Sequence, residues 1–300
     1  MDYQTFTEKL ADCVRRRVGR GTVVDLRTVY GNNHCARRGI SIIENENEVV
    51  PRIFLEPFYE QYRKGNSLET VADAFLQAHE ECSVHTEIFS GDFNELSRVR
   101  DTLSLQIVNR EMNRAELVAM PHRDFLDLSV ICSYSPDLIG LCRGRTLVWN
   151  EDVIRWQASP EELFATAAKN LRKYDPPTVR PLKEELLALG GEDLFSEEEG
   201  ECRDVPLLVL TSRSRLYGAV YMADELLTRR IAECFDSDYF VLPSSVHEVL
   251  ILPAKRDLDT GGLSDLVEYV NTVAVPDEQI LSGNIYYYDR ENGGMEVVNS

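Results

Sequence analysis

Polar residues of the types used in nucleophilic catalysis gather in one short segment between two apolar runs of strand length. The segment, YFVLPSSVHEVLIL, begins at Tyr239 and has a polar turn that holds Ser244, Ser245, His247 and Glu248. A serine hydroxyl beside a histidine base is the arrangement by which hydrolases and transferases form covalent intermediates. The segment is therefore the first place to look for a reaction of that kind.

The spacing of Ser245 and His247 also fits an ordinary turn. Residues two apart on a strand share a face, but their Cβ atoms lie roughly 7 Å apart, which is far for a direct hydrogen bond. No G-x-S-x-G elbow occurs in the chain, and serine hydroxyls in turns commonly bond the local backbone. Catalysis would need a further group, for which His122 in the segment PHRD and Glu248 are the candidates.

A second polar segment, beginning at Asp257, resembles the calcium loop of EF-hand proteins. Acidic residues stand at loop positions one, three, nine and twelve, and Gly262 stands at position six. Position five is Gly261, however, and the aliphatic residues before the loop leave no incoming helix. The helix dipole favours acids ahead of a helix without any metal. We therefore expect no metal, and the candidate ligands to check are Asp257, Asp259, Asp265 and Glu268.

The common cofactor signatures are absent. The chain has no G-x-x-x-x-G-K-[ST], no G-x-G-x-x-G after a strand and no H-E-x-x-H. His79, Cys82 and His85 are spaced three apart, but nothing nearby completes the four ligands of a structural zinc site. We expect no cofactor.

Composition indicates a folded, acidic, cytoplasmic protein. Of the 300 residues, 43% are hydrophobic and 28% charged, and the formal net charge is −19. Such a charge repels polyanions, so nucleic acid and anionic membranes are not expected as partners. No apolar run reaches the ~18 residues of a membrane span, and no apolar leader segment follows Met1. The seven cysteines are irregularly spaced without a C-x-x-C, as is typical of reduced thiols.

Hydrophobic periodicity and capping residues predict the helices. Tyr3, Phe6, Leu10 and Val14 recur at helical spacing and predict a helix over 2–18. Ser67 can cap a second helix, and the segment Ser159 to Glu162 (SPEE) is a capping box with proline at the first helical position. Further helices are expected after residue 224 and over 263–270.

Alternating and short apolar runs predict the strands. They are expected over 22–29, 39–43, 52–55, 103–107, 126–132, 207–210, 217–222, 239–242, 247–252, 285–289 and 295–298. The order strand, strand, helix occurs twice after residue 207. This predicts an α+β fold of antiparallel strand-strand-helix units with helices packed on one face of the sheet. Two α+β lobes are expected, over 1–119 and 120–300, with an acidic connection near 183–204.

Three segments carry a resemblance to a known family. They are MPHRDFLDLSVI from Met120, the stretch 150–170 with its W-x-x-S-P-E-E-L core, and the stretch from Leu210 through Gly218 to Glu248. Together they resemble an uncharacterised family of clostridial gut Firmicutes, domain of unknown function 5688, nearly from end to end. The resemblance implies Thr-Asn at the position where this chain has Thr211-Ser212, so no role of that amide is carried over to this chain. The resemblance implies a bacterial cytoplasmic protein and supplies no mechanism.

The sequence leaves two functions open. The first is a non-enzymatic module that binds a protein or a small ligand, which the regular α+β pattern and the incomplete catalytic set favour. The second is a hydrolase or transferase that uses Ser245 or His247 with His122 or Glu248. The sequence alone does not decide whether the protein is an enzyme.

Overall fold

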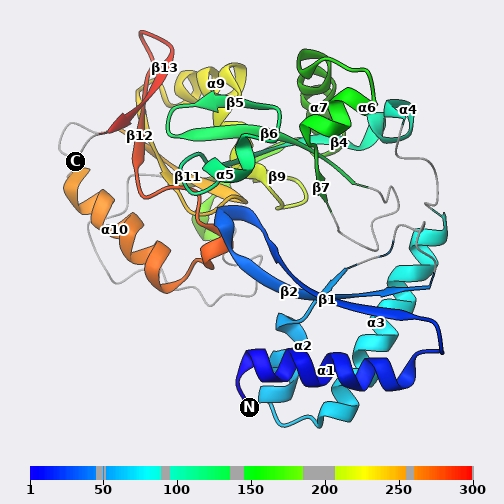
Figure 1. The fold of residues 1–300 in the computed structure, drawn as a ribbon. Coiled ribbons are helices and arrows are strands. Elements are labelled where there is room, and N and C mark those ends of the chain that lie inside the picture. The colour runs from blue at the N-terminus through cyan, green and yellow to red at the C-terminus, as the bar shows by residue number, and fades with distance from the viewer. Residues whose placement is uncertain are drawn as a thin grey trace.

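The computed structural model describes residues 1–44, 50, 52–88, 95–135, 145–184, 207–254 and 260–298. Within these ranges the strands form three antiparallel sheets of three, four and six strands, and helices pack against them (Figure 1). The predicted α+β class is confirmed. We call residues 1–88 the small lobe and residues 95–298 the large lobe.

The small lobe contains one sheet and its helices. Its sheet has the strand order β1-β2-β3. Strands β1 and β2 pair along their whole length as an antiparallel hairpin. The elements are α1 (Tyr3–Arg17), β1 (Val23–Tyr30), η1 (Asn32–His34), β2 (Ala36–Ile43), β3 (Ile53–Phe54), α2 (Glu56–Arg63) and α3 (Leu68–Ile88).

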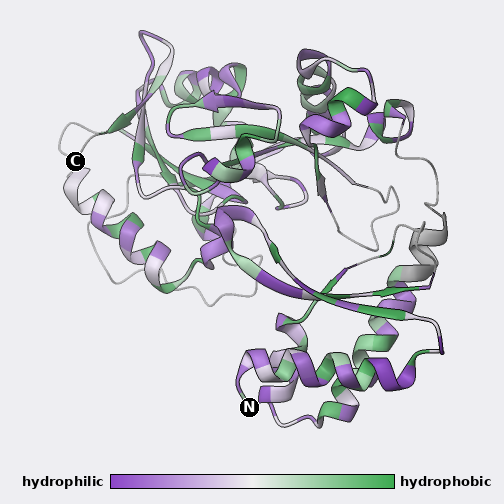
Figure 2. Ribbon diagram, in the orientation of Figure 1, coloured by the Kyte–Doolittle hydropathy of each residue, from purple (hydrophilic) through white to green (hydrophobic). Residues whose placement is uncertain are grey.

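The small-lobe helices follow the predicted pattern. The predicted helix over 2–18 is α1, which begins after Asp2, whose side chain accepts from the Thr5 N–H. Hydrophobic and hydrophilic residues alternate along α1 in Figure 2, as in an amphipathic helix. Phe6 and Leu10 on its apolar face are fully buried against Phe75 of α3 and Ile40 of β2, in one core.

The four-stranded sheet of the large lobe is built from β4, β5, β6 and β7, with β6 between β4 and β5. Helix α7 packs on β4, and the predicted capping serine, Ser159, accepts from the Glu162 N–H at 3.1 Å. The elements are α4 (Leu96–Val99), η2 (Arg100–Thr102), β4 (Leu103–Asn109), α5 (Arg114–Leu117), β5 (His122–Phe125), β6 (Leu128–Tyr134), β7 (Thr146–Leu147), α6 (Asn150–Arg155) and α7 (Pro160–Tyr174).

The six-stranded sheet of the large lobe has the order β13-β12-β10-β11-β9-β8. Its strands are all paired antiparallel. The elements are β8 (Pro177–Pro181), β9 (Leu208–Ser212), η3 (Gly218–Ala223), α9 (Glu225–Phe235), β10 (Tyr239–Pro243), β11 (Glu248–Pro253), α10 (Thr260–Val273), η4 (Asp277–Gln279), β12 (Ile285–Asp289) and β13 (Gly294–Val298).

Two details of this sheet differ from the expectation. Residues 217–222, expected as a strand, form the 3-10 helix η3, because Gly218 packs directly on the backbone of β9 and leaves no room for a paired strand. Helices also cover both faces of the sheet. Tyr239 donates from its hydroxyl to α9, whereas Phe240, the next residue, packs with Val267 of α10; neighbouring strand residues point to opposite faces.

Two of the hydrophobic cores are built from different parts of the chain. One cluster uses buried residues from Phe6 to Phe75, and another uses residues from Val99 to Tyr288. The expected lobe boundary at 119/120 stays a prediction about independent folding, but the β4–β6 ladder spans it, for example at Ile107 and Val130. Of the expected acidic connection 183–204, only residues 183 and 184 lie within the described residues.

Candidate functional site

The loop between β1 and β2 docks onto the large lobe through side-chain amides. Asn33 and His34 have left-handed backbone conformations, with φ of 57° and 55°, which asparagine accepts more easily than most residues. Asn33 Nδ2 donates to the carbonyl oxygens of Asp277 and Ile280 at 2.8 and 2.7 Å. Asn113 Oδ1 accepts from the Asn33 N–H, and Asn113 Nδ2 donates to Asn33 Oδ1. These bonds fix the hairpin tip between α5 and η4.

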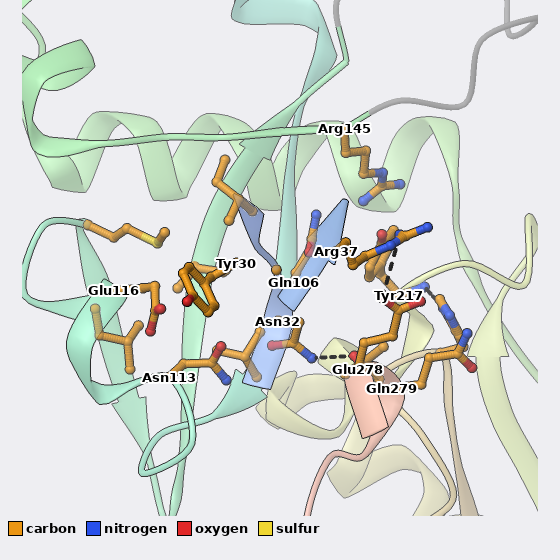
Figure 3. Close-up of a pocket in the computed structure, with 18 of the residues that line it drawn as sticks. Tyr30, Asn32, Arg37, Gln106, Asn113, Glu116, Arg145, Tyr217, Glu278 and Gln279 are labelled. Carbon is orange, nitrogen blue, oxygen red and sulfur yellow. Dashed lines mark hydrogen bonds and ion pairs between the residues drawn. The ribbon is translucent and has the colours of Figure 1, made fainter. Parts of the chain in front are cut away.

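A cavity of about 300 Å³ lies between this hairpin and the large lobe. Its volume is at the lower end of the range for small-molecule sites. Figure 3 shows polar side chains of both lobes around it. Four aromatic side chains from separate segments also line the wall: Tyr30, Phe54, Trp149 and Tyr217.

Arg145 brings a positive charge to the cavity without a counter-ion. Its guanidinium lies 4.8 Å from the ring centroid of Tyr217 and donates to Ser104 Oγ at 3.4 Å. Among the described residues no carboxylate lies within 4.0 Å of it, and Asp175 acts on it only at longer range. Burial lowers the pKa of Arg145, yet a guanidinium stays charged at neutral pH. A desolvated cation without a counter-ion favours the binding of an anion.

Arg37, on the same cavity, shows the contrast. Its guanidinium pairs with Glu56 at 3.2 Å and with Glu278 at 3.5 Å, and it lies 4.0 Å over the Phe54 ring. Its charge is therefore already balanced within the protein. Arg145, and not Arg37, is the cation that remains available to a ligand.

His247 lies on the wall beside Arg145 and Tyr217. Its Nδ1 accepts from the Tyr217 N–H at 3.0 Å, so the neutral imidazole carries its proton on Nε2. Burial, and then the positive charge of Arg145, lowers the pKa of His247. The ring is thus neutral at physiological pH, and its Nε2–H has no partner in the described part of the chain.

The backbone that carries Tyr217 is tightly fixed. Tyr217 has a φ of 57°, which is uncommon for a bulky residue. The following Gly218 lies so close to β9 that a Cβ would be 2.1 Å from the Ser212 nitrogen and 2.6 Å from the Thr211 Cα. The ring of Tyr217 is held 5.1 Å from the His247 ring, between centroids. Backbone strain of this kind concentrates at functional sites.

Gln106 is a buried polar side chain that faces the cavity. It lies on β4, is only 5% exposed, and stands near the middle of the cavity in Figure 3. Its amide has no hydrogen-bond partner among the described residues. Buried amides are normally bonded, so this one is open to a ligand.

The opposite end of the cavity is acidic. Glu116 Oε1 lies 2.7 Å from His34 Nδ1, whereas Glu116 Oε2 and Asn32 Oδ1 are buried without a hydrogen-bond partner within the described ranges. In Figure 3, Glu116 and Arg145 lie on opposite sides of Gln106. The cavity therefore has a positive and a negative end.

The predicted catalytic residues of the hairpin form a turn. Ser245 Oγ accepts from the His247 N–H at 3.0 Å, and the Ser245 N–H donates to the Glu248 carbonyl at 3.1 Å. No hydrogen bond joins the Ser245 hydroxyl to the His247 imidazole in the described structure. Of these residues His247 lines the cavity, whereas Ser245 and Glu248 do not.

His122 lies apart from that turn. It is on β5, and its Nδ1 lies 3.0 Å from the Met120 carbonyl oxygen, with Asp124 3.9 Å from its Nε2. None of its contacts reaches Ser245 or His247. The structure therefore brings His247 to the cavity without the assisting histidine that the sequence suggested.

The calcium candidates are only partly covered by the structure. Asp265 and Glu268 lie in α10, and Asp257 and Asp259 lie outside the described residues. Across the described ranges, no group of three or more histidine, cysteine or acidic residues is placed to hold a metal ion. The calcium loop stays untested as a whole.

Most residues of the cavity were missed by sequence reasoning. Gln106, Glu116, Arg145 and Tyr217 come from four segments spread over more than a hundred positions, and no spacing connects them. One signal existed at Gln106. It lies on the polar face of the predicted strand 103–107, opposite Leu105 and Ile107, and in the structure it is buried there and lines the cavity.

No helix in the described ranges is long and apolar enough to cross a membrane. The cysteines that the structure describes are free thiols: Cys13, Cys35, Cys82, Cys132 and Cys234.

Comparison with known proteins gives one match. The sequence model of DUF5688, described as a family of unknown function, matches residues 3–290. This confirms the resemblance inferred from the three sequence segments. No curated protein matches the chain, and no solved structure matches it.

Proposed function

Because the chain belongs to DUF5688, a family of unknown function, we propose its function from the chemistry of the cavity. The protein is a binding module for a small molecule that carries an anionic group. The ligand lies between the β1–β2 hairpin and the large lobe, with its anion at Arg145.

The observation that carries this proposal is the unpaired guanidinium of Arg145. Charged groups that leave water are normally paired, and Arg37 in the same wall is paired twice. An anionic ligand would give Arg145 the counter-ion that the described residues do not supply. Arginine binds carboxylates and phosphates through two parallel hydrogen bonds, so the anion is of one of these classes.

Two neutral donors and several rings support the same ligand. The Gln106 amide and the His247 Nε2–H face the cavity without partners among the described residues. Aromatic side chains such as Tyr30 and Tyr217 supply apolar contact around them. Convergent polar groups beside apolar and aromatic side chains are typical of small-molecule sites.

A reaction on the bound molecule is the second candidate. The lowered pKa of His247 keeps its imidazole neutral, and its position on the cavity wall would let it act as a general acid or base. Ser245 is not part of this candidate, because its hydroxyl is engaged in the turn. Turnover of the bound molecule by the wild type, lost in His247→Gln with binding retained, would establish it.

We further propose that the protein acts in the cytoplasm of a bacterium. Five free thiols among the described cysteines fit a reducing compartment. The net charge of −19 repels polyanions such as nucleic acid. The proposed binding partner is the small ligand.

Native mass spectrometry of the protein recovered from its own host tests the binding proposal. We expect a mass above that of the 300-residue chain, and a released small molecule that contains a carboxylate or phosphate. Arg145→Gln removes the charge and keeps a polar side chain, so it is expected to be recovered without the ligand.

Arg63→Gln is the matched control. Arg63 lies on α2, is exposed, and pairs with Glu60 at 3.2 Å away from the cavity. It should retain the ligand as the wild type does. A wild-type protein recovered at its bare sequence mass, or a ligand that is retained in Arg145→Gln, would contradict the proposal.

A further inference from the structure

We infer that the ligand is dipolar, with its anion at Arg145 and an ammonium group at Glu116. The inference rests on the proposed function and adds the chemistry of the ligand's second end. The chemical class that fits is an amino acid or a short peptide with an apolar side chain.

Among the described residues, no lysine or arginine lies within 4.0 Å of the Glu116 carboxylate. The charged group within 4.0 Å of its carboxylate, among the described residues, is the imidazole of His34. That imidazole contacts Oε1, whereas Oε2 of the carboxylate has no hydrogen-bond partner among the described residues. The Glu116 side chain is only 18% exposed, and water therefore compensates little of that charge.

Unsatisfied acceptors surround this negative end. Glu116 Oε2 and Asn32 Oδ1 are both buried without hydrogen-bond partners in the described ranges, and both residues line the cavity. An ammonium group offers three N–H donors and no acceptor. Bound to the Glu116 carboxylate, it would supply the missing donor and balance the charge.

A side-chain rotation is enough to present a carboxylate oxygen of Glu116. The terminal torsion of a glutamate is broad and costs little to turn. The turn moves both oxygens, so the cavity gains an acceptor and the 2.7 Å contact of Oε1 with His34 is given up. The bonds of Asn113 to Asn33 hold the neighbouring backbone in place during that rotation. The site needs no rearrangement of the fold.

The remaining cavity residues limit the size and chemistry of the ligand between its two charged groups. Gln106 stands between the charged ends in Figure 3, where its amide can bond a backbone-like carbonyl or N–H. Tyr30, Phe54 and Trp149 surround the remaining space, and a volume of about 300 Å³ admits one amino acid or a dipeptide. Apolar and aromatic side chains fit this lining.

A panel of matched ligands tests the inference by calorimetry and thermal shift. It consists of the apolar and aromatic amino acids and their glycyl dipeptides, each beside its desamino acid, which keeps the carboxylate and lacks the ammonium group. We expect at least one zwitterion to bind about tenfold or more tightly than its desamino acid, the value of a charge-assisted hydrogen bond. Glu116→Gln should remove that difference.

Glu111→Gln is the control for Glu116→Gln. Glu111 is 80% exposed, pairs with Arg114 at 3.5 Å, and lies outside the cavity, so its loss should change neither ligand. Equal affinity of the desamino acid and the zwitterion would overturn the dipolar ligand and leave an anion site. A panel in which nothing binds would overturn the inference too, while the native mass measurement decides the anion site separately.

Discussion

Substitution of Gly218 by alanine should disturb both the stability of the large lobe and the cavity. A Cβ at this position would lie 2.1 Å from the Ser212 nitrogen and 2.6 Å from the Thr211 Cα and carbonyl carbon. All three are backbone atoms of β9, which is paired on both sides with β8 and β11. The strand cannot give way by rotating a side chain. Either η3 or the strand must move.

The cost can be set from this geometry. One extra methylene in a packed core costs about 1–3 kcal/mol when side chains can adjust. Here the obstacle is the main chain, so we expect about 3 kcal/mol or more of the free energy of unfolding to be lost. For a chain of this size that loss lowers the melting temperature by roughly 6–12 °C. Since Tyr217 precedes the glycine and bonds His247, ligand binding should weaken as well.

Gly283→Ala is the matched control, measured beside Gly218→Ala by urea denaturation and calorimetry. A Cβ at Gly283 meets nothing within 4 Å, and its φ is not in the left-handed region. The control should be neutral or gain a few tenths of a kcal/mol, because alanine restricts the unfolded chain. If Gly218→Ala were as stable as Gly283→Ala, the close packing of η3 on β9 would be refuted.

Three further predictions concern single side chains. The pKa of His247 is lowered by burial and by Arg145, so the unfolded state binds this proton more readily. The free energy of unfolding should therefore fall as the pH drops below the unfolded histidine value of about 6.5, and urea denaturation should show a smaller fall in His247→Gln. Asn33→Ala should cost about 2 kcal/mol in the same assay. Asn33→Gly, which tolerates the φ of 57°, should show most of that loss if it comes from the bonds to Asp277, Ile280 and Asn113; full recovery in Asn33→Gly would assign the loss to the backbone. Asp127→Ala removes the acceptor of Ser282, Asn284 and Tyr286 and should cost about 3 kcal/mol; a loss under about 1 kcal/mol would show that these bonds contribute little.

Local signals predicted the elements well where the side chains that decide them are close in sequence. Ser159 caps α7 as its capping box indicates, and Asp224, where a helix was expected to open, caps α9 through the Leu226 and Leu227 N–H groups. The period of α1 likewise identified Phe6 and Leu10 as core residues. Such patterns depend on a few neighbouring positions, so they can be read without the tertiary structure.

Segments decided by distant contacts were predicted less well. The apolar run after Tyr217 has the composition of a strand, but contact of Gly218 with the backbone of β9 makes it a 3-10 helix. The position of helices on both faces of the six-stranded sheet was also not predicted, because it too depends on distant contacts. Nothing within the sequence of α9 or α10 specifies which face of the sheet each will cover.

Of the cavity residues discussed above, the sequence had identified only His247 as a candidate. The turn around Ser245 was a candidate catalytic segment because turns and catalytic sites use the same residue types. Among the described residues, Arg145 lacks a counter-ion, the Gln106 amide lacks a hydrogen-bond partner, and so does Glu116 Oε2. These properties depend on the folded surroundings and are invisible in the sequence.

The most direct test of the central claim is a crystal structure of the protein purified from its own host without added ligand. We predict electron density for a small molecule between Gln106 and Arg145, with an anionic group bonded to the guanidinium. Density for water alone in this cavity, in a protein of full occupancy and intact fold, would contradict it.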